Sequence, residues 1–573
     1  MGDSLVLLLL DVFRRLKSRL PPPSSPSDYS HQLLLCVCLL QAGFTNFKIF
    51  EASSRVGGRT FADEDGTDLG GAYIGPTQDR IMQIVDELGL RLRKVNTGGK
   101  TVQLLDGQVQ QYDGMIPPVS LLGALDLNAA MVQMDAFVSG VNMASPHLSN
   151  DATRLDRMTA EEIICEVTYT EDARKILRTA IRSILCVEPC QLSDLYLMWY
   201  MAQSGGVPRI FETKDGAQDC KVVGGAGQIA PLLAKKYTPE GSNRLQLDCP
   251  IRSLEVLSPS SLGGRGERGD NSSNGSKDGE RSESTDKTPS SSSSSPPSIR
   301  LVTSTGKVIL AHHVILAIPP TQMLRIQYSP PLPAARYTAL QNWPMGCICK
   351  TFMYYDTPFW RDENHNGMIV CDEGIVCVSY DDTNEDGTHP CLMGFVLANQ
   401  ALLPLSSEER KQAICRRYQE CFNSDQALRP VRYKEKMWAE EQWVGGCYVG
   451  SVGPNVLTAS QRVQCEVYAS VVHVAGTEAA YRGIGYMDGA VESGERVGRN
   501  VLVDLGVLTE EHRGVVSTPP PSHQLPFVPM QLSSMEKWLL PSVGTVLGGM
   551  AVVVAVAVVM VGNLYSPKVV SGL

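Results

Sequence analysis

The sequence lacks the features of several protein classes. Its 573 residues contain 51 Lys and Arg against 61 Asp and Glu, a net charge of −10, so it has no basic excess for binding nucleic acid or an acidic membrane surface. The 16 cysteines lack the paired CxxC spacing of a structural zinc site, and a chain of this length needs no disulfide staples. We therefore expect a reducing compartment and a small or neutral ligand.

A secretion signal and internal repeats are also missing. The apolar run "LVLLLL" at 5–10 precedes the basic residues at 14–19, whereas a signal peptide begins with basic residues and has a longer apolar segment. The sequence shows no repeat of solenoid period. Secretion and a repeat architecture are therefore not expected.

One long apolar run is present near the C-terminus. Residues 543–562 carry no charge, and as a helix they would span about 30 Å of hydrocarbon. A buried core helix is the alternative, but such helices are amphipathic and this segment is apolar all round. We predict a C-terminal linker at 505–541, a transmembrane tail anchor at 542–562, and a cytosolic bulk.

The rest of the chain alternates helix and strand patterns. Helical periodicity is clear at 77–90 and 171–187, and strand patterns occur at 47–53, 314–320 and 473–478, which predicts α/β or α+β architecture. The Ser-rich, Gly-rich and charged tract at 258–298 cannot bury enough apolar surface to fold. Since strand patterns flank it, we predict a disordered insertion between two strands of one sheet.

A strand that ends in an acid indicates a dinucleotide site. In "FKIFEASSRVGGRT", 47–60, Glu51 ends the strand and Gly57, Gly58 and Arg59 follow in a loop. In a Rossmann-type half, such an acid binds the ribose hydroxyls, and glycines let the backbone approach the cofactor. We predict that these four residues bind the cofactor; an ordinary surface acid is the alternative.

Three further segments narrow this interpretation. They are "DLGGAYIGPTQDRIMQIVDELGL" at 68–90, "WVGGCYVG" at 443–450 and "HVAGTEAAYRGIGYMDGAVESGERV" at 473–497. Together they resemble the flavin-containing amine oxidases, and within these the monoamine oxidases, over about 33–257, 299–507 and the tail. The resemblance implies FAD as cofactor, a two-domain α/β fold with an α+β substrate domain, and oxidative deamination of arylalkyl monoamines.

The resemblance also implies the domain boundaries and the surroundings of the protein. A discontinuous FAD-binding domain would comprise 33–92, 223–339 and 441–504, a substrate-binding domain 93–222 and 340–440, and 1–32 would be an atypical N-terminal segment. The reactants would be a small amine and O2, and the products an aldehyde, ammonia and hydrogen peroxide. The predicted location of the protein would be the cytosolic face of the mitochondrial outer membrane. A homodimer is left open.

The resemblance assigns the flavin attachment to Cys447. A thioether would join its sulfur to the 8α-methyl carbon of the flavin, and Gly445 and Gly446 would leave room for the backbone beside the ring. Tyr448 and Tyr486 would flank the substrate as an aromatic pair that favours an amine between two π faces. Taken alone, an inert buried thiol and two core tyrosines are the alternatives.

Lys350 lies in a strand pattern at 344–360 whose side chains alternate between two faces. A lysine inside an apolar strand is costly to bury, so we expect a partner or a cavity. The resemblance implies a contact with flavin N5 through a water, where the lysine would assist the reaction with oxygen. An edge lysine that reaches solvent is the alternative.

The resemblance supplies the remaining site residues. Phe211 is bulky and Val378 small, so we expect a cavity that is narrow at its entrance and wider further in. The implied substrate-binding residues are Tyr73, Leu185, Phe211, Gln218, Val378 and Phe395. The implied cofactor contacts, besides those above, are Ile251, Gly476, Thr477, Glu478 and Met487.

The chain departs from the family where the cofactor phosphates should bind. A strand and a G-x-G-x-x-G loop should place glycines near 27–32, yet no glycine occurs between Gly2 and Gly43. The loss would remove a central strand of the parallel sheet and the helix N-terminus that meets the pyrophosphate. An alternative first exon or a wrong gene model would explain it. We expect weak or absent FAD loading and poor stability.

Two other functions stay open. A polyamine or histone-lysine oxidase of the same superfamily would hold its flavin noncovalently and favour acidic pocket residues. A catalytically inactive, membrane-tethered relative is the second, because the glycine loop is missing.

Overall fold

The computed structural model describes residues 44–113, 117–257, 298–397, 405–461 and 468–514, together with the backbone of β1 (Val6–Leu10). The predicted tail anchor, nearly all of the predicted insertion and most of the N-terminal segment lie outside the described residues.

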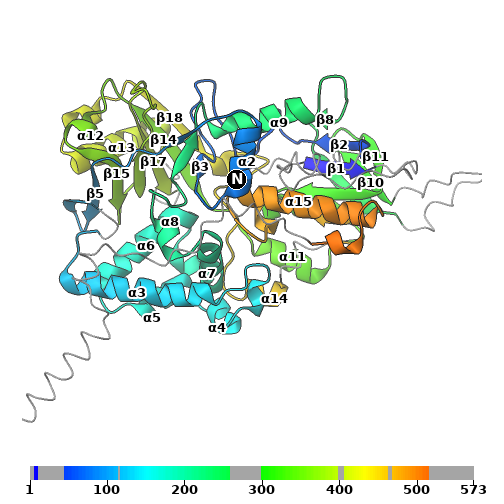
Figure 1. Cartoon of the computed structure of the whole chain (residues 1–573), viewed down its shortest axis with the longest axis horizontal. Helices are drawn as coiled ribbons and strands as arrows, with labels where there is room; N and C mark the ends of the chain where they lie inside the picture. The colour runs from blue at the N-terminus through cyan, green and yellow to red at the C-terminus, as the bar shows by residue number, and fades with distance from the viewer. Residues whose placement is uncertain are drawn as a thin grey trace, which may run out of the picture.

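A five-stranded sheet forms one half of the molecule, on the right of Figure 1. In spatial order its strands are β19 (Val472–Val474), β12 (His313–Ala317), β1, β2 (Phe47–Phe50) and β8 (Leu245–Gln246). β12 and β19 pair in parallel, as do β2 and β8, whereas β1 is antiparallel to both of its neighbours. Four strands therefore run in one direction and β1 alone runs in the other. The three strands predicted from sequence patterns are confirmed.

The prediction that a central strand is lost is wrong in one respect. Its position is filled by β1, in which Leu7 pairs with Phe50 and Leu316, and Leu10 with Phe47 and His313. Because β1 is reversed, its C-terminal end lies at the edge opposite to the end of β2, where the ribose-binding acid is predicted. The C-terminal end of β1 therefore does not lie at the edge where a forward central strand would place a phosphate-binding turn.

Helices cover one face of this sheet and a second sheet covers the other. The helices are α2 (Asp79–Glu87), α9 (Ile229–Tyr237) and α15 (Met487–Asp504). The second sheet has the order β11 (Val308–Ala311), β10 (Ile299–Thr303), β9 (Ile251–Val256) and β13 (Gln327–Ser329), with α10 (Pro320–Met323) and α11 (Ala334–Gln341) nearby. Ile49 and Ile315 pack with the helices, while Phe50 and Leu316 pack toward the second sheet, as strand alternation requires.

The strands that flank the predicted insertion are neighbours. β9 and β10 pair antiparallel from Val256 to Ile299. The prediction that the tract at 258–298 joins two strands of one sheet is confirmed.

A seven-stranded sheet forms the other half, at the upper left of Figure 1. Its order is β18 (Arg432–Met437), β14 (Ile348–Tyr354), β17 (Cys391–Leu397), β16 (Val378–Asp381), β15 (His365–Cys371), β5 (Lys100–Leu105) and β6 (Gln108–Tyr112). α12 (Phe359–Asp362) and α13 (Ser407–Phe422) pack on one face. A further small sheet has the order β3 (Tyr73–Ile74), β7 (Cys220–Val222) and β4 (Leu92–Lys94).

Both faces of β14 are internal. All seven of its residues are buried; Cys349 and Met353 face the core under α13, and Ile348 and Phe352 pack in a separate cluster. Lys350 shares the parity of this second set, so its side chain leaves the strand on the face away from α13.

A layer of helices lies below the seven-stranded sheet in Figure 1. It comprises α3 (Leu121–Ser139), α4 (Ala152–Arg157), α5 (Ala160–Val167), α6 (Glu171–Leu185), α7 (Asp194–Gln203), α8 (Val207–Phe211) and α14 (Val456–Ser460). Among the described helices, α3 alone is long and apolar enough to cross a membrane, and half of its apolar window is buried in the protein. The predicted helix at 171–187 corresponds to α6.

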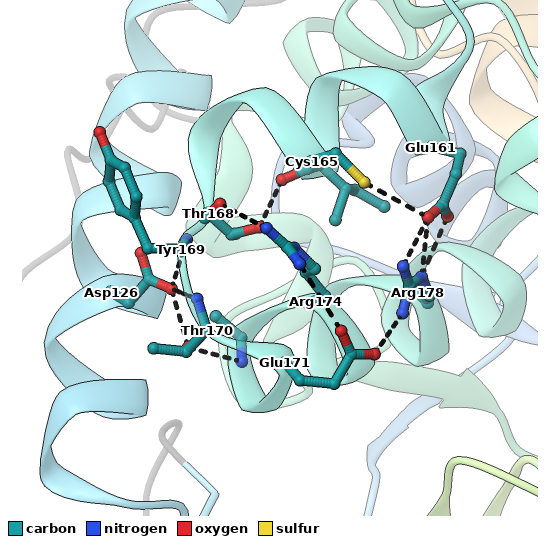
Figure 2. A network of polar contacts seen from close by, with 11 residues as sticks. Asp126, Glu161, Cys165, Thr168, Tyr169, Thr170, Glu171, Arg174 and Arg178 are labelled. Atoms are coloured by element: carbon teal, nitrogen blue, oxygen red, sulfur yellow. Dashed lines mark hydrogen bonds and ion pairs between the residues drawn. The ribbon is translucent and has the colours of Figure 1, made fainter.

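Polar contacts fix three helices of this layer (Figure 2). Asp126 of α3 accepts hydrogen bonds at Oδ2 from the backbone N–H groups of Tyr169 (2.8 Å) and Thr170 (2.6 Å) and from the Thr170 hydroxyl (2.8 Å). Thr170 caps the N-terminus of α6. Further along α6, Arg178 donates to both carboxylate oxygens of Glu161 on α5. The start of α6 is therefore set by a charge on α3.

We expect Asp126→Asn to lower the free energy of unfolding by about 1–2 kcal/mol, because three donors lose a charged acceptor. The matched control is Asp151→Asn, since Asp151 makes no side-chain cap and has the left-handed backbone that Asn accepts. Urea unfolding of the full chain measures both, with a change below about 0.5 kcal/mol for the control. Equal effects of the two changes would contradict the role of Asp126.

Candidate active site

A cavity of about 200 Å³ lies between the helical layer and the seven-stranded sheet. Nine of the predicted site residues line it: Tyr73, Phe211, Gln218, Lys350, Val378, Phe395, Cys447, Tyr448 and Tyr486. Lys350 is the one charged residue among its described lining residues, and no Asp or Glu lies among them. The structure thus brings together residues from distant parts of the chain around an almost uncharged space.

Leu185 differs from its prediction. It is the last residue of α6, is fully buried and packs in the core of the helical layer. Ile176, Ala180 and Ile184 line the cavity instead. Residues four apart share one face of a helix, so the spacing of these three in the sequence could have identified the correct face.

Cys447 is held at the cavity wall by a close passage of two chain segments. Its backbone N–H donates to the Gly346 carbonyl at 2.8 Å. Gly446 has φ +148°, and a Cβ there would lie 2.5 Å from the Gly346 oxygen, so no larger residue fits. Burial raises the pKa of the Cys447 thiol to about 11, although Arg59 and Lys350 act to lower it. In this state the sulfur is a thiol at neutral pH, and it must lose its proton before it can act as a nucleophile.

The two predicted tyrosines both line the cavity, and each is held by a different ring. Tyr448 packs edge-on against Phe395, with centroids 5.4 Å apart, and Tyr486 stacks on Tyr200 at 5.7 Å. The Tyr486 hydroxyl accepts a hydrogen bond from the Ser204 hydroxyl at 3.1 Å, whereas the polar neighbour of the Tyr448 side chain is the buried thiol of Cys186.

Lys350 is anchored to backbone rather than to a carboxylate. Its Nζ donates to the carbonyls of Asp68 (2.6 Å) and Gly70 (2.9 Å). Burial, and next the charge of Lys221, lower the pKa of Lys350 to about 8. Because the side chain is 3% exposed, the alternative of an edge lysine that reaches solvent is wrong.

Arg59 and Glu478 form a buried ion pair that joins three of the sequence motifs. The guanidinium meets both carboxylate oxygens, at 2.7 and 2.9 Å, and also donates to the Tyr448 carbonyl at 2.8 Å. Glu478 accepts a further hydrogen bond from the Gly450 backbone at 3.1 Å. Although burial acts to raise it, the charge of Arg59 holds the pKa of Glu478 below its usual value. These side chains cross-link the protein, and their contact with a cofactor stays a prediction.

The other predicted cofactor residues lie in the half of the molecule with the five-stranded sheet. Glu51 follows β2 and accepts hydrogen bonds from the backbone and hydroxyl of Ser53, both at 2.8 Å. A Cβ at Gly57 would lie 2.6 Å from the Thr60 carbonyl oxygen. The remaining positions are Gly58 in the same loop, Ile251 at the start of β9, Gly476 and Thr477 after β19, and Met487 at the start of α15.

Sequence comparison places these observations in a family. The family model described as flavin containing amine oxidoreductase matches residues 35–276 and 287–502. The chain belongs to this family. It is 34% identical over 518 residues to amine oxidase [flavin-containing] A of Equus caballus, covering 89% of this chain and 90% of the relative. It is 32% identical over 514 residues to amine oxidase [flavin-containing] B of Homo sapiens, with 88% and 90% covered.

Solved structures share the fold of this amine oxidase. Cyclohexylamine oxidase from Brevibacterium oxydans superposes with a TM-score of 0.71 at 23% identity, covering 82% of this chain and 96% of that one. A putrescine oxidase bound to putrescine gives a TM-score of 0.70 at 24% identity, with the same coverage. The predicted mixed α/β flavoenzyme fold is confirmed; the domain boundaries stay a prediction.

The family implies a flavin cofactor. Cys447, Lys350 and Tyr448 line one cavity, and Glu51 follows β2 in the five-stranded sheet. That these residues would hold the ring and the ribose of a flavin nucleotide stays a prediction. Between them, the described residues supply no glycine loop after a central parallel strand, since β1 is reversed. The phosphate end of the site is therefore the part that departs from the family.

Sequence reasoning missed a cluster of charges behind Lys350. Lys221 donates to Asp382 at 2.5 Å and lies 3.9 Å from the Asp68 carboxylate. All three are largely shielded from solvent. The sequence did contain one signal of this cluster. Lys221 in "CKVVGG" is a charged residue in a short apolar stretch, and such a residue needs a partner when it is buried.

We expect Glu478→Gln to lower the free energy of unfolding by about 3–5 kcal/mol, because the Arg59 charge stays buried without its counter-ion. Glu385→Gln is the control: its pair with Arg91 is exposed on both sides, so the loss should stay below about 1 kcal/mol.

The pH dependence gives a second measurement. Since the folded pKa of Glu478 is lowered, its stabilisation is present above the unfolded pKa and lost as pH falls through the folded value. Denaturation at several acidic pH values should show a smaller decline for Glu478→Gln than for the natural chain. Identical declines would show that the pair contributes nothing.

Proposed function

We propose that this flavin-containing amine oxidase is a monoamine oxidase that uses FAD to convert primary arylalkyl amines to aldehydes, ammonia and hydrogen peroxide. The observation that carries the proposal is the apolar cavity whose described wall holds Lys350, six tyrosines including Tyr448 and Tyr486, and no carboxylate. A single ammonium group can lose its proton there, whereas a second fixed charge on the substrate would stay unpaired. The names of the horse and human relatives, amine oxidases A and B, agree with this class.

The residues of the chain bind, orient and shield the substrate. Tyr448 and Tyr486 offer ring faces to the amine, and Phe211 and Val378 shape the space for its aryl group. A flavin held beside Lys350 and Cys447 would supply the redox chemistry, two-electron oxidation of the amine coupled to reduction of oxygen. The enclosing apolar wall excludes bulk water from the reacting amine.

We further propose that FAD is attached covalently through Cys447 and that the uncharged segment 543–562 anchors the protein in the mitochondrial outer membrane, facing the cytosol. The position of Cys447 on the cavity wall behind a residue that must be glycine supports the attachment. The composition of the segment supports the anchor.

A catalytically inactive relative is the second candidate, favoured by the reversed β1 and the missing glycine loop. A polyamine oxidase is disfavoured, because such a pocket would pair its second ammonium with an acid and the described wall has none.

We expect the full chain, expressed in detergent, to carry less than one flavin per chain, because larger side chains replace the phosphate-binding glycines. The loaded fraction should keep its flavin after acid denaturation, and Cys447→Ser should release it. Cys347→Ser is the control, because Cys347 is a second thiol, half-buried and close to Lys350 in the sequence, and is not a predicted attachment site. Absorbance of the denatured protein and the mass of the flavin peptide measure both.

Each result of this experiment is decisive. Flavin on the peptide of Cys447 supports the oxidase, and flavin on another peptide contradicts the attachment. One flavin per chain contradicts weak loading, and a folded protein without flavin favours the inactive relative.

We expect kcat/KM for phenylethylamine to exceed that for putrescine by roughly 100-fold or more, because the cavity offers no carboxylate to a second ammonium. Val378→Asp should reduce this ratio at least tenfold, whereas Val378→Asn, of the same size and without charge, should reduce it less. A ratio near one in the natural chain would contradict the monoamine assignment. The measurement is initial rates of peroxide formation.

A further inference from the structure

A second, polar cavity of about 490 Å³ lies behind the active-site wall. Asp68, Lys221, Arg93 and Asp382 line it, together with exposed residues such as Asp386. The active-site cavity is lined by the residues that directly follow Asp68, from 69 to 73. One short segment of chain is therefore the partition between an apolar and a polar space.

Lys350 and Asp68 connect the two spaces across this partition. The Lys350 ammonium lines the apolar cavity and donates to the Asp68 carbonyl at 2.6 Å, while the residue Asp68 itself lines the polar cavity. The ammonium groups of Lys350 and Lys221 lie 6.0 and 5.7 Å from the centre of the Tyr73 ring. A charge change at Asp68 is therefore felt directly by Lys350.

The Asp68 carboxylate is buried and incompletely bonded. It is 1% exposed, Oδ1 accepts one long hydrogen bond from Gly227 (3.4 Å), and Oδ2 has no hydrogen-bond donor among the described residues. Lys221 approaches Oδ2 only to 3.9 Å because it donates to Asp382, which also accepts from Arg93 at 3.2 Å. Of the two acids, Asp382 has two cationic donors and Asp68 has none, so Asp68 is left able to take up a proton.

The pKa values agree with this geometry. Burial raises the pKa of Asp68 to about 6, whereas Asp382, despite burial, has its pKa lowered by Lys221 and Arg93. Lys350 has a pKa of about 8. Asp68 therefore titrates below neutral pH and Lys350 above it.

The proposed reaction needs a proton to leave and return. An amine in water carries one more proton than the neutral form that is oxidised, and the reduction of oxygen to hydrogen peroxide takes up one proton beyond the hydrogen from the α-carbon. Over a turnover the two cancel, so one group that releases a proton and later takes one back is sufficient, and the apolar cavity itself need not open to water.

We propose that Asp68 is the proton-exchanging carboxyl of this active site, linking Lys350 to solvent in the polar cavity. In each transfer an N–H bond of the Lys350 ammonium breaks and an O–H bond forms on Asp68, leaving a neutral amine and a carboxylic acid; no electrons move. The acid then gives its proton to water in the polar cavity, and the reverse sequence returns it. A bridging water carries the proton between the two side chains. The inference rests on the proposed amine oxidation.

The charged groups facing Asp68 come from three elements and have opposite effects. Lys221 of β7, Lys350 of β14 and Asp382 after β16 surround it. At Lys350, Asp68 and Asp382 act to raise the pKa and Lys221 acts to lower it. Asp68→Asn should therefore move the titration of Lys350 to lower pH, and Lys221→Met should move it to higher pH.

The first test needs no bound flavin. Infrared difference spectra of the full chain between pH 5 and 8 should show a carboxyl C=O band that titrates near pH 6 and is absent in Asp68→Asn. The control is Asp386→Asn, an exposed acid at the same cavity whose pKa is lowered by hydrogen bonds from Thr388, so the band should persist. A band that persists in Asp68→Asn overturns the proposal.

The second test uses the flavin-loaded enzyme in stopped flow. The reaction of the reduced enzyme with oxygen at neutral pH should slow roughly 100-fold in Asp68→Asn and stay unchanged in Asp386→Asn. The pH midpoint of this rate should fall in Asp68→Asn and rise in Lys221→Met. A merely structural role would change stability or flavin content without moving the midpoint, and that result overturns the proposal.

The failures of the two proposals are distinguishable. If the natural chain oxidises no amine but its band titrates and depends on Asp68, the proposed function fails, and the role of Asp68 in that reaction is overturned with it although the carboxyl titrates. If the chain oxidises amines but the band does not depend on Asp68, the proposed function stands and the role of Asp68 alone is overturned. If Asp68→Asn does not fold, Lys221→Met decides: an upward shift of the midpoint supports the proposal and an unchanged midpoint overturns it.

Discussion

The buried pair of Arg59 and Glu478 is the constraint on which the site depends. It joins the loop after Glu51 to the segment after β19, and through the Tyr448 carbonyl and the Gly450 amide it also holds the segment that carries Cys447. Two charges without solvent are stable only when their hydrogen bonds are satisfied in one geometry. Three segments are therefore fixed to one another around this pair: Arg59 lies 389 residues from Tyr448, and Gly450 lies 28 residues from Glu478. The position of the cavity wall depends on these contacts.

A second constraint is the separation of charge across the partition at 68–73. On one side the described wall carries Lys350 as its single charge; on the other, the cations Lys221 and Arg93 face the carboxyl groups of Asp382 and Asp68. Lys350 reaches the partition through carbonyl groups, which satisfy an ammonium without a counter-ion in the substrate space. An amine substrate thus meets no fixed negative charge, which is the electrostatic condition for a neutral amine in a buried site.

The sequence predicted the helices and strands more accurately than the contacts that their side chains make. Periodicity located β2, β12, β19, α2 and α6, and strand patterns located the hairpin across the tract at 258–298. Nine predicted residues meet at one cavity because the motifs that contain them are specific. Leu185 was misplaced by one position because matching a motif ignores which helix face is turned inward, and Ile184 is on that face. The cluster of Asp68, Lys221 and Asp382 escaped notice because its members lie in three distant segments, and only the fold brings them within reach of Lys350.

The direction of β1 shows why a strand pattern cannot fix topology. A short run of apolar residues carries no alternation that distinguishes its two ends, and backbone hydrogen bonds form in either direction between two open strand edges. β2 and β12 leave such edges facing each other, and an unpaired pair of edges in the centre of a sheet is costly because its N–H and C=O groups are buried. Val6–Leu10 satisfies those groups from the wrong direction. The sheet is thereby complete as a scaffold for Glu51 and for the pair of Arg59 and Glu478, while the C-terminal end of β1 lies at the edge opposite to the end of β2. Stability of the sheet and binding of the phosphates, which one forward strand normally provides together, are therefore separable in this chain.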